Sequence, residues 1–555
     1  MIQQLFVSME CTGDPMKYRA LCWFFLLVLP SFQTALSQQY RLDTLAASPN
    51  TSQPVVIAFV PGNSGTFFFT EKTTGKVRIF KANQLQPNPF VTVSVTSGGE
   101  QGLLGIAVHP QYPDSPYIYI FYTQSGNRDN IVVRYRDSNG VGVDPVPLVL
   151  VPRNNTATNH NGGNVHFGPD GKLYVTFGEY ASSSNAQDTI SSNLRGKILR
   201  LNPDGTIPTD NPFPGKAFWS YGHRNSFDFT FDSQTGKMYC SENGPSCDDE
   251  INLVPRGGNL GWPVDGNCTY GGSPAYVRPL YFFPSNLPAL TGIVVYRSTA
   301  FPRLRGKLLF TGNSIPTLWT LTLTASGDTI VPNSFATFFT YGTGFADVEI
   351  GPDGNIYITN GPYSSNRVLR LRPIAPVFTS AAPLTATKGV QYSYTPTFNG
   401  TLPGLSIVSG PQGMFVDTTT WTVKWTPTDA QGGLQSVTLR AENGAGFDTQ
   451  TFTINVPVTS IDEYEGNPKE FALHQNFPNP FNPSTSIIYS ILQEGHVRMS
   501  VFDVLGREVA LLQEGVQRSG TYRLLFSSVD LPSGVYFYRI QAPGFVETKK
   551  MVITK

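Results

Sequence analysis

Apolar and polar positions alternate in short runs along most of the chain, and two of these runs are near copies. Residues 165–178 and 348–361 each read as a strand, a Pro-Asp-Gly turn and a second strand. Each copy is followed by a further apolar run, at 196–201 and 367–371. A period of two residues is typical of β-strands, and a Gly-containing turn between two such runs predicts a hairpin. The pattern therefore predicts a repeated unit of three or more antiparallel strands.

Looser copies of this unit occur through the first two thirds of the chain. They are Thr66–Thr70 with Gly75–Phe80, Tyr117–Thr123 with Ile131–Tyr135, Lys237–Gly244, and Lys307–Gly312 with Leu318–Leu321. Six units of roughly 55 residues thus lie between Tyr40 and Pro373. Radial repetition of small antiparallel sheets limits exposed strand edges, so we expect an all-β fold with a six-bladed β-propeller at 38–374. Loops from every blade would meet at one channel mouth.

The residue composition and the pattern of apolar positions change after the predicted propeller. Residues 375–458 are rich in Thr, Val and Gly and contain alternating runs, which predicts an immunoglobulin-like β-sandwich. A polar linker is expected at 459–470, and a further segment follows at 471–555.

The first 37 residues have the features of an export signal. Lys17 and Arg19 form a basic start, 20–29 is a short apolar core, and 35–37 supplies a small-residue cleavage site. The polar segment before Met16 suits a true start at that methionine. The apolar run is about half of the ~20 residues that cross a bilayer, so we expect no transmembrane anchor. The mature protein is expected to be exported and soluble.

The composition limits the classes of partner that we expect, and the cysteines are considered in light of the expected export. The 39 Lys and Arg residues balance 39 Asp and Glu residues, which gives no basic surface for nucleic acid. The 53 glycines and 44 prolines fit many tight turns. Beyond the export signal, Cys247 and Cys268 flank one loop-rich segment and form the expected disulfide. Cys240 stands in a strand-like run and is expected to be a buried free thiol.

Four segments stand out from ordinary blade sequence. They are Gly99-Glu-Gln-Gly-Leu-Leu-Gly-Ile-Ala-Val-His-Pro110, Asn159-His-Asn-Gly-Gly163, Trp219-Ser-Tyr-Gly-His-Arg-Asn225, and Ser241-Glu-Asn-Gly-Pro245 with Asp248-Asp-Glu-Ile-Asn252 and Gly261-Trp-Pro263. In order and spacing they resemble the soluble glucose and aldose sugar dehydrogenase (glucose/sorbosone dehydrogenase) family across essentially the whole propeller. The resemblance implies that pyrroloquinoline quinone (PQQ) and calcium serve to oxidise the anomeric carbon of aldoses. The electron acceptor would be external, because the chain has no Cys-x-x-Cys-His haem motif.

The resemblance assigns His160 as the general base. An imidazole titrates near neutral pH, so it can accept the sugar hydroxyl proton as hydride leaves C1. The alternative is a histidine packed on the channel wall. Glu179 matches an acidic position that orients this imidazole, and its alternative is a solvated loop carboxylate.

The resemblance also assigns the cofactor and metal ligands. Arg224 and Asn225 match the pair that contacts the quinone carbonyls, where a guanidinium stabilises developing charge; the alternative is an arginine tied to a neighbouring blade. The PQQ-contacting glutamine of the family aligns with Glu100, or with Gln101 if the loop shifts by one residue. The calcium site is expected at the carbonyls of Gly244 and Pro245. Asp248, Asp249 and Glu250 make this loop acidic, with Asp248 and Glu250 as candidate ligands; alternatively the carboxylates cap a turn or bind a structural ion.

One departure from the family pattern concerns the three PQQ carboxylates. Characterised members hold them with a Lys and nearby Arg residues late in the propeller, whereas this chain has Ser314, Gly344 and Ala346 at these positions. A buried unpaired charge costs several kcal/mol, so this loss would weaken PQQ binding. Arg297, Arg303 and Arg305 are the cations that could substitute from another direction.

The C-terminal 85 residues carry a second resemblance. They contain Gln475-Asn-Phe-Pro-Asn-Pro-Phe-Asn-Pro483, Val501-Phe-Asp-Val-Leu-Gly-Arg507 and Leu531-Pro-Ser-Gly-Val-Tyr-Phe-Tyr-Arg539, and end in Lys550-Met551 and Lys555. This pattern resembles the type A sorting domain of the bacterial type IX secretion system. The resemblance implies a small β-sandwich at 471–555, passage across the outer membrane, and release or attachment at the cell surface.

Three functions remain open on the sequence. The first is an exported PQQ- and calcium-dependent aldose dehydrogenase. The second is a non-catalytic surface propeller that binds glycans or proteins, as the missing carboxylate clamp and the accessory sandwich suggest. The third is a calcium-dependent hydrolase of the lactonase type, because six-bladed propellers host those as well.

Overall fold

The structure is a computed structural model of the 555-residue chain. It describes residues 40–554 except 154, 191, 265–274, 286, 362–365, 458–460, 465–467 and 529–530. The expected export signal and Cys268 lie outside the described residues. Cys247 is disulfide-bonded and Cys240 is a buried free thiol, so the expectation for Cys240 is confirmed.

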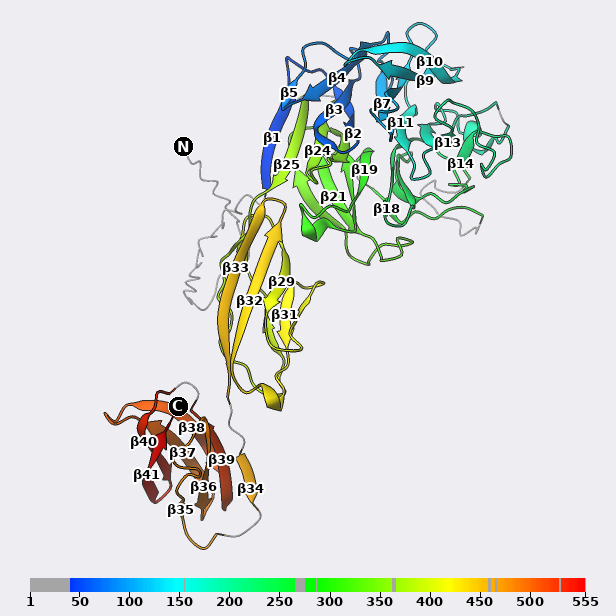
Figure 1. Cartoon of the computed structure of the whole chain (residues 1–555). Coiled ribbons are helices and arrows are strands. Elements are labelled where there is room, and N and C mark those ends of the chain that lie inside the picture. The colour runs from blue at the N-terminus through cyan, green and yellow to red at the C-terminus, as the bar shows by residue number, and fades with distance from the viewer. Residues whose placement is uncertain are drawn as a thin grey trace, which may run out of the picture. The chain divides into compact units, whose positions relative to one another are not determined.

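Residues 40–373 fold into six small antiparallel sheets, the blades of a propeller (Figure 1). Blades one to three comprise β2 (Pro54–Val60), β3 (Asn63–Glu71), β4 (Lys76–Lys81), β5 (Gln84–Leu85) and β6 (Val91–Thr92); β7 (Leu103–Val108), β8 (Tyr117–Thr123), β9 (Asn130–Asp137) and β10 (Gly142–Val151); and β11 (Gly162–Phe167), β12 (Leu173–Phe177), β13 (Lys197–Leu201) and β14 (Phe218–Tyr221). Blades four to six comprise β15 (Ser226–Phe231), β16 (Met238–Glu242), β17 (Asp249–Leu253) and β18 (Tyr281–Phe283); β19 (Leu290–Tyr296), β20 (Lys307–Gly312), β21 (Thr317–Thr322) and β22 (Ala336–Thr340); and β23 (Phe345–Ile350), β24 (Ile356–Asn360), β25 (Arg367–Pro373) and β1 (Tyr40–Ala47). The six-bladed architecture predicted from the repeats is confirmed.

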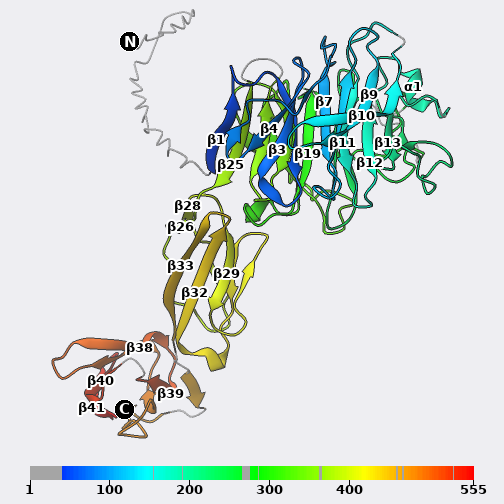
Figure 2. The same ribbon diagram turned by 45° about the horizontal axis from the view of Figure 1, so that its top comes forward.

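The innermost strands close the ring. β2, β7, β11, β15, β19 and β23 each contact the next innermost strand, and β23 returns to β2. Figure 2 shows β7 and β11 running side by side within this ring. The sixth blade joins both ends of the propeller, because β1 pairs antiparallel with β25 from Tyr40 opposite Pro373 to Ala47 opposite Arg367. A closed ring leaves the channel mouth as the place where the blade connections meet.

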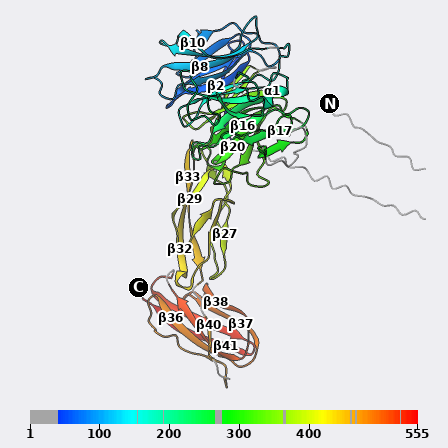
Figure 3. The same cartoon turned by 90° about the vertical axis from the view of Figure 1, so that its right-hand side faces the viewer.

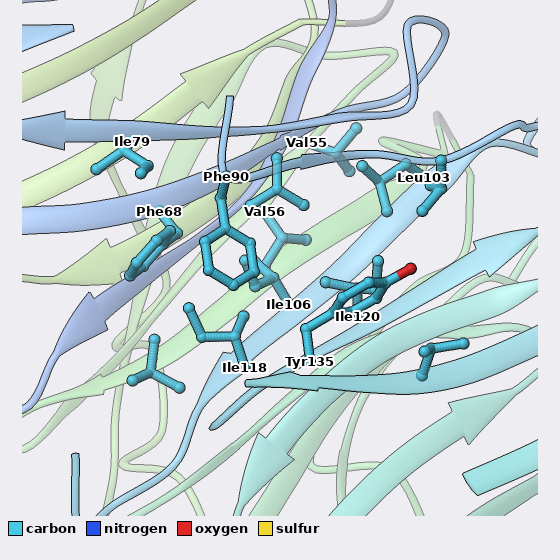
Figure 4. Packing of buried hydrophobic residues seen from close by; sticks show 14 of the residues in the cluster. Val55, Val56, Phe68, Ile79, Phe90, Leu103, Ile106, Ile118, Ile120 and Tyr135 are labelled. Carbon is cyan, nitrogen blue, oxygen red and sulfur yellow. The ribbon is translucent and has the colours of Figure 1, made fainter. Parts of the chain in front are cut away.

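Apolar side chains between neighbouring blades form the propeller's core. Figure 4 shows the cluster between the first two blades, where Val56, Phe68, Phe90, Ile106 and Ile120 are all buried. Each fully buried side chain of this size contributes roughly 1.5–3 kcal/mol of burial free energy. All six residues of β7 are buried, which explains why its sequence is continuously apolar instead of alternating.

Two buried aspartates on inner strands link adjacent blades through backbone N–H groups. The Asp228 carboxylate on β15 accepts from the N–H of Ile293 on β19 at 2.9 Å, and Asp347 on β23 accepts from Ile57 on β2 at 2.9 Å. His166 Nε2 lies 2.9 Å from Asp228. The second contact joins the last blade to the first.

Three sheets follow in the immunoglobulin-like region. Its strands are β26 (Val377–Phe378), β27 (Tyr392–Tyr394), β28 (Phe398–Asn399), β29 (Gly404–Ser409), β30 (Phe415–Asp417), β31 (Thr422–Trp425), β32 (Gly433–Asn443) and β33 (Gly446–Val456). They enclose their own core around Trp425, which is almost fully buried. Described helices are limited to α1 (Ser184–Gln187) and two 3-10 turns, Pro302–Leu304 and Asp429–Gln431.

The C-terminal region forms two four-stranded sheets, in the orders β34-β39-β36-β35 and β38-β37-β40-β41 (Figure 3). Its strands are β34 (Ile461–Tyr464), β35 (Ala472–Leu473), β36 (Ser484–Ile491), β37 (Gly495–Phe502), β38 (Glu508–Gln517), β39 (Gly520–Ser527), β40 (Gly534–Ala542) and β41 (Phe545–Ile553). Its core is separate as well, with Met499, Leu524 and Tyr538 fully buried. This is the small β-sandwich that the sequence predicted.

Candidate active site

A cavity of about 760 Å³ lies where connections from several blades meet. This volume is typical of small-molecule sites. Its walls come from distant parts of the chain: Val55, Lys72, Gly99, Glu100, Leu104, His160, Arg224, Asn225, Phe227, Asn243, Gly244, Pro245, Asp249, Leu287, Ala289, Leu290, Thr291, Asn313, Ser314, Pro316, Gly342, Thr343, Gly344 and Ala346. All four segments singled out in the sequence contribute to this region or to the residues directly behind it.

His160 lines the cavity in a strained backbone conformation. Its φ is +57°, a left-handed value that is uncommon for residues other than glycine. The glycines beside it explain how the chain reaches this conformation. Gly163 has φ +115°, and a Cβ there would lie 2.7 Å from Leu104 Cδ1. Gly178 passes so close that a Cβ would lie 2.2 Å from the His160 carbonyl. Close packing of bare backbone therefore aims the histidine into the cavity.

The His160 ring is held by Glu179, as the sequence predicted. Its Nδ1 is hydrogen-bonded to Glu179 Oε1, and the Glu179 side chain is only 2% exposed. This contact leaves Nε2 as the ring nitrogen that a ligand in the cavity can meet. A carboxylate that accepts the Nδ1 proton keeps the lone pair on Nε2, which is the arrangement a general base needs.

Glu100, and not Gln101, is the residue that faces the cavity. Glu100 Oε2 accepts from the backbone N–H of His160 at 2.7 Å and of Asn161 at 3.4 Å, and from Asn225 Nδ2 at 3.2 Å. Gln101 is fully buried outside the cavity lining and accepts from Arg128 at 3.3 Å. Of the two alternatives, Glu100 is thus the one that lines the cavity, and it also joins the His160 and Asn225 loops.

Arg224 and Asn225 lie side by side on the cavity wall. The carboxylate of Glu242 accepts from both backbone N–H groups, at 2.7 and 2.6 Å, while Arg224 Nη1 donates to the Asn243 carbonyl at 2.7 Å. Arg224 Nε is buried without a hydrogen-bond partner in the described structure. Burial lowers the pKa of the Arg224 guanidinium, an effect that Glu179 and other nearby carboxylates oppose. The guanidinium is therefore a poorly solvated cation beside the His160–Glu179 pair.

The expected calcium segment divides between two cavities. Gly244 and Pro245 line the main cavity, together with Asp249. Asp248 and Glu250 line a second, much smaller cavity of about 20 Å³, which Gly244 lines as well. Asp249 is the first residue of β17, so side-chain alternation turns Glu250 to the other side, while Asp248 precedes the strand with φ +70°. Its carboxylate accepts from Gly244 N–H at 3.0 Å and Ala289 N–H at 2.8 Å, and burial raises its pKa.

Besides Arg224, the cation that lines the cavity is not one of those considered in the sequence. Among the described lining residues, Lys72 and Arg224 are the cationic side chains. Arg297 pairs with Asp232 at 2.7 Å, and Arg297, Arg303 and Arg305 do not line the cavity. Ser314, Gly344 and Ala346 do line it, so the positions that lack the clamp cations face the same space as His160. Lys72 was missed because Glu-Lys-Thr-Thr-Gly reads as an ordinary hairpin turn.

The sequence profile of the family named glucose/sorbosone dehydrogenase matches residues 51–369, more than half of the chain. The chain belongs to the glucose/sorbosone dehydrogenase family. Residues 375–457 match an Ig domain profile, and residues 475–554 match a secretion system C-terminal sorting domain. The two resemblances inferred from the sequence and the predicted immunoglobulin-like region are thus confirmed at the level of the family.

Three individual proteins illustrate what this dehydrogenase-family chain is similar to. Quinoprotein glucose dehydrogenase B of Acinetobacter calcoaceticus is 32% identical over 262 residues, covering 42% of this chain and 54% of the relative. Aldose sugar dehydrogenase YliI of Escherichia coli is 28% identical over 373 residues, covering 63% and 98%. The human hedgehog-interacting protein is 31% identical over 186 residues, covering 29% and 27%.

Solved structures extend the likeness to the whole propeller. The PQQ-bound form of the aldose sugar dehydrogenase from Streptomyces coelicolor superimposes with a TM-score of 0.51 at 26% identity, covering 60% of this chain and 98% of that one. The apo form of the soluble aldose sugar dehydrogenase from Escherichia coli gives 0.54 at 26% identity, covering 60% and 99%. No helix in the described part of the chain has the length and hydrophobicity of a membrane-spanning segment.

Proposed function

We propose that this chain is an exported sugar oxidoreductase that oxidises the anomeric carbon of aldoses with PQQ and calcium. The observation that carries the proposal is the convergence of His160, Glu179, Arg224 and Asn225 at one cavity, with the His160 ring already oriented. Membership of the glucose/sorbosone dehydrogenase family and the PQQ-bound relative support the same chemistry.

The residues present fit a quinone at one end of the cavity. Arg224 and Asn225 offer N–H donors there, and the partnerless Arg224 Nε is a buried donor that a quinone oxygen would satisfy. When bound, PQQ would supply a two-electron acceptor for hydride from the sugar C1. Arg224 would stabilise the negative charge that develops at this end of the cavity.

His160 would take the proton of the sugar C1 hydroxyl at Nε2. Glu179 would hold the Nδ1 proton and stabilise the imidazolium that forms, since it lies buried against that nitrogen. The apolar side chains of Val55, Leu104 and Phe227 on the cavity wall would exclude water from this transfer.

Calcium would bind at the carbonyl oxygens of Gly244 and Pro245, with waters completing its shell. Backbone carbonyls are hard oxygen ligands that suit this ion. Asp249 faces the same cavity and supplies negative charge nearby, while Asp248 and Glu250 would support the loop from the far side. The sorting domain supports type IX secretion to the cell surface or the medium, and the electron acceptor would be external.

The decisive experiment is a PQQ titration of the purified protein in excess calcium, followed by dye reduction with a panel of aldoses. We expect sugar-dependent turnover that His160→Ala lowers by roughly 10²–10⁴-fold with PQQ affinity retained, because general-base catalysis contributes about that factor. Turnover that is unaffected by His160→Ala would reject the assignment of the base. No PQQ binding at high micromolar concentration would reject the dehydrogenase.

A second candidate is a non-catalytic propeller that binds a surface glycan or protein. It is favoured by the uncharged residues at positions 314, 344 and 346 and by the partial likeness to the hedgehog-interacting protein. The same titration separates the two candidates, because a purely binding propeller would take up no PQQ.

A further inference from the structure

Lys72 occupies a fixed position at the rim of the cavity. It follows β3 directly, in the turn that leads into β4. Its backbone N–H donates to the Gln53 carbonyl at 3.0 Å, and its own carbonyl accepts from Leu103 N–H at 3.0 Å. Its ammonium donates to the Ser97 carbonyl at 3.3 Å. The side chain is half-buried, and burial lowers the pKa of the ammonium. A cation that is partly withdrawn from water gains much from a bound anion.

Ring closure brings this turn close to the segment that lacks the clamp cations. Val55 of the first blade and Ala346 of the last blade belong to one buried cluster, and Ile57 N–H donates to Asp347 at 2.9 Å. Lys72, Gly344 and Ala346 line the same cavity. The undescribed residues between 40 and 554 include no Lys or Arg, so they supply no further cation.

Glu100 is the obvious alternative partner for Lys72, since its charge acts on the Lys72 ammonium. Its Oε2, however, already accepts from His160 N–H, Asn161 N–H and Asn225 Nδ2. Among the described residues, no ion pair joins Lys72 to Glu100. Glu100 thus holds two loops together, and the ammonium retains capacity for an anion.

We propose that Lys72 is the anion anchor of this cavity, binding a carboxylate of the cofactor in place of the cations missing at positions 314, 344 and 346. The inference rests on the proposed function and deepens it. In this proposal the cation that binds the cofactor carboxylate comes from the first blade, whereas in characterised family members it comes from the late blades. With Arg224, the cavity lining then offers two cationic side chains to a polyanion.

The test is a PQQ titration of the full chain in excess calcium, read by absorbance without sugar. Lys72→Gln should weaken binding by roughly 10- to 100-fold, the usual loss for a charge-assisted hydrogen bond. Lys72→Arg, which keeps the charge, should bind close to wild type. Lys172→Gln is the matched control, because Lys172 lies in the β11–β12 turn outside the cavity lining and donates to Asn202 at 2.7 Å.

A double variant separates an anchor from a counter-ion of Glu100. If Lys72 only neutralised Glu100, Lys72→Gln with Glu100→Gln would bind PQQ as tightly as Glu100→Gln alone, and that result would overturn the inference. An anchor predicts that the double variant binds PQQ more weakly than Glu100→Gln alone. Equal affinity of wild type and Lys72→Gln would overturn the anchor and leave the dehydrogenase intact, whereas a wild type without PQQ binding would overturn both.

A labelling experiment on the wild-type protein tests the same proposal without any substitution. Acetic anhydride should acetylate Lys72 more slowly in the presence of PQQ, while Lys172 reacts at an unchanged rate, as followed by peptide mass spectrometry. Protection of Lys72 supports the anchor. Equal rates with and without bound PQQ would overturn it.

Discussion

Glu242 shows how one side chain organises the candidate site without lining its main cavity. It is 5% exposed and accepts from the backbone N–H groups of Arg224 and Asn225, from His223 Nδ1 at 3.0 Å, and from Ser226 Oγ. Four donors converge on one carboxylate, so the pair that faces the ligand has little freedom. We regard Glu242 as a positioning residue.

Glu242→Gln should loosen this arrangement, because the amide turns a donor toward groups that also donate. We expect a loss of roughly 2–4 kcal/mol in the free energy of unfolding of the propeller, measured with urea. PQQ affinity should fall in parallel while the His160–Glu179 pair is retained. Glu494→Gln, on an exposed residue, is the control for loss of charge. Unchanged stability would show that Glu242 does not organise the pair.

The same residue gives a pH dependence with a definite sign. Burial alone would raise the pKa of Glu242, but the hydrogen bonds from His223 and Ser226 prevail and lower it. A depressed pKa in the folded state contributes stability that is present above the ordinary pKa near 4.5 and is lost as pH falls through the folded value. Glu242→Gln should therefore flatten the acid limb of the stability curve.

At the residue scale, the sequence predicted which motif residues meet at the cavity but not every neighbour. His160, Glu179, Arg224 and Asn225 stand in distinctive motifs, and the fold brings all four together. Lys72 carries no such signal, because only closure of the ring places its turn beside the cavity. The choice of Asp249 over Asp248 and Glu250 depended on where β17 begins, and strand boundaries shift by a residue or two in any sequence reading.

At the scale of strands and blades, prediction succeeded where local chemistry decides. The Pro-Asp-Gly turns in the copies at 165–178 and 348–361 correspond to the β11–β12 and β23–β24 hairpins. What the repeats did not reveal is how neighbouring blades hold each other. The aspartate contacts to Ile57 and Ile293 join innermost strands of different blades through buried carboxylates.

Asp347 makes the last-to-first blade contact dependent on pH. Burial raises its pKa well above the ordinary value, and Glu349 and Asp228 add to the effect. A raised folded-state pKa contributes stability that is present below about pH 4 and lost as pH rises, at about 1.4 kcal/mol per pH unit between the two pKa values. Asp347→Asn keeps an acceptor for Ile57 N–H.

We therefore expect Asp347→Asn to raise the melting temperature, with a gain that grows from pH 5 to pH 8 in calorimetric scans. Asp114→Asn, at an exposed site, should show no such trend. A gain that is constant across this range, or a loss at every pH, would contradict the titration of Asp347.

At the scale of the whole molecule, the buried clusters of the described residues separate into three regions, and none of them spans two regions. Every residue of the C-terminal core lies at or beyond Phe471, and the core around Trp425 lies within the immunoglobulin-like region. The sorting domain therefore does not depend on propeller residues for its packing.

Removal of 471–555 should leave the thermal transition of the propeller unchanged and abolish delivery to the cell surface or medium. The first outcome follows from the separate cores, and the second from the match to a secretion system sorting domain. Calorimetry of the purified proteins and fractionation of the producing cells check the two parts. A truncated protein that still reaches the medium would contradict the sorting role.

The sixth blade has a consequence for biosynthesis. Its outer edge is the segment 40–47, made early, while the strands it must pair with end at Pro373. The entire propeller has to be synthesised before that sheet can form, so a nascent chain cannot pair β1 with β25 and close the ring. Under the proposed export, a chain whose last blade is not yet closed would be in a form that can pass through a pore, and pairing of β1 with β25 would then complete the propeller after passage.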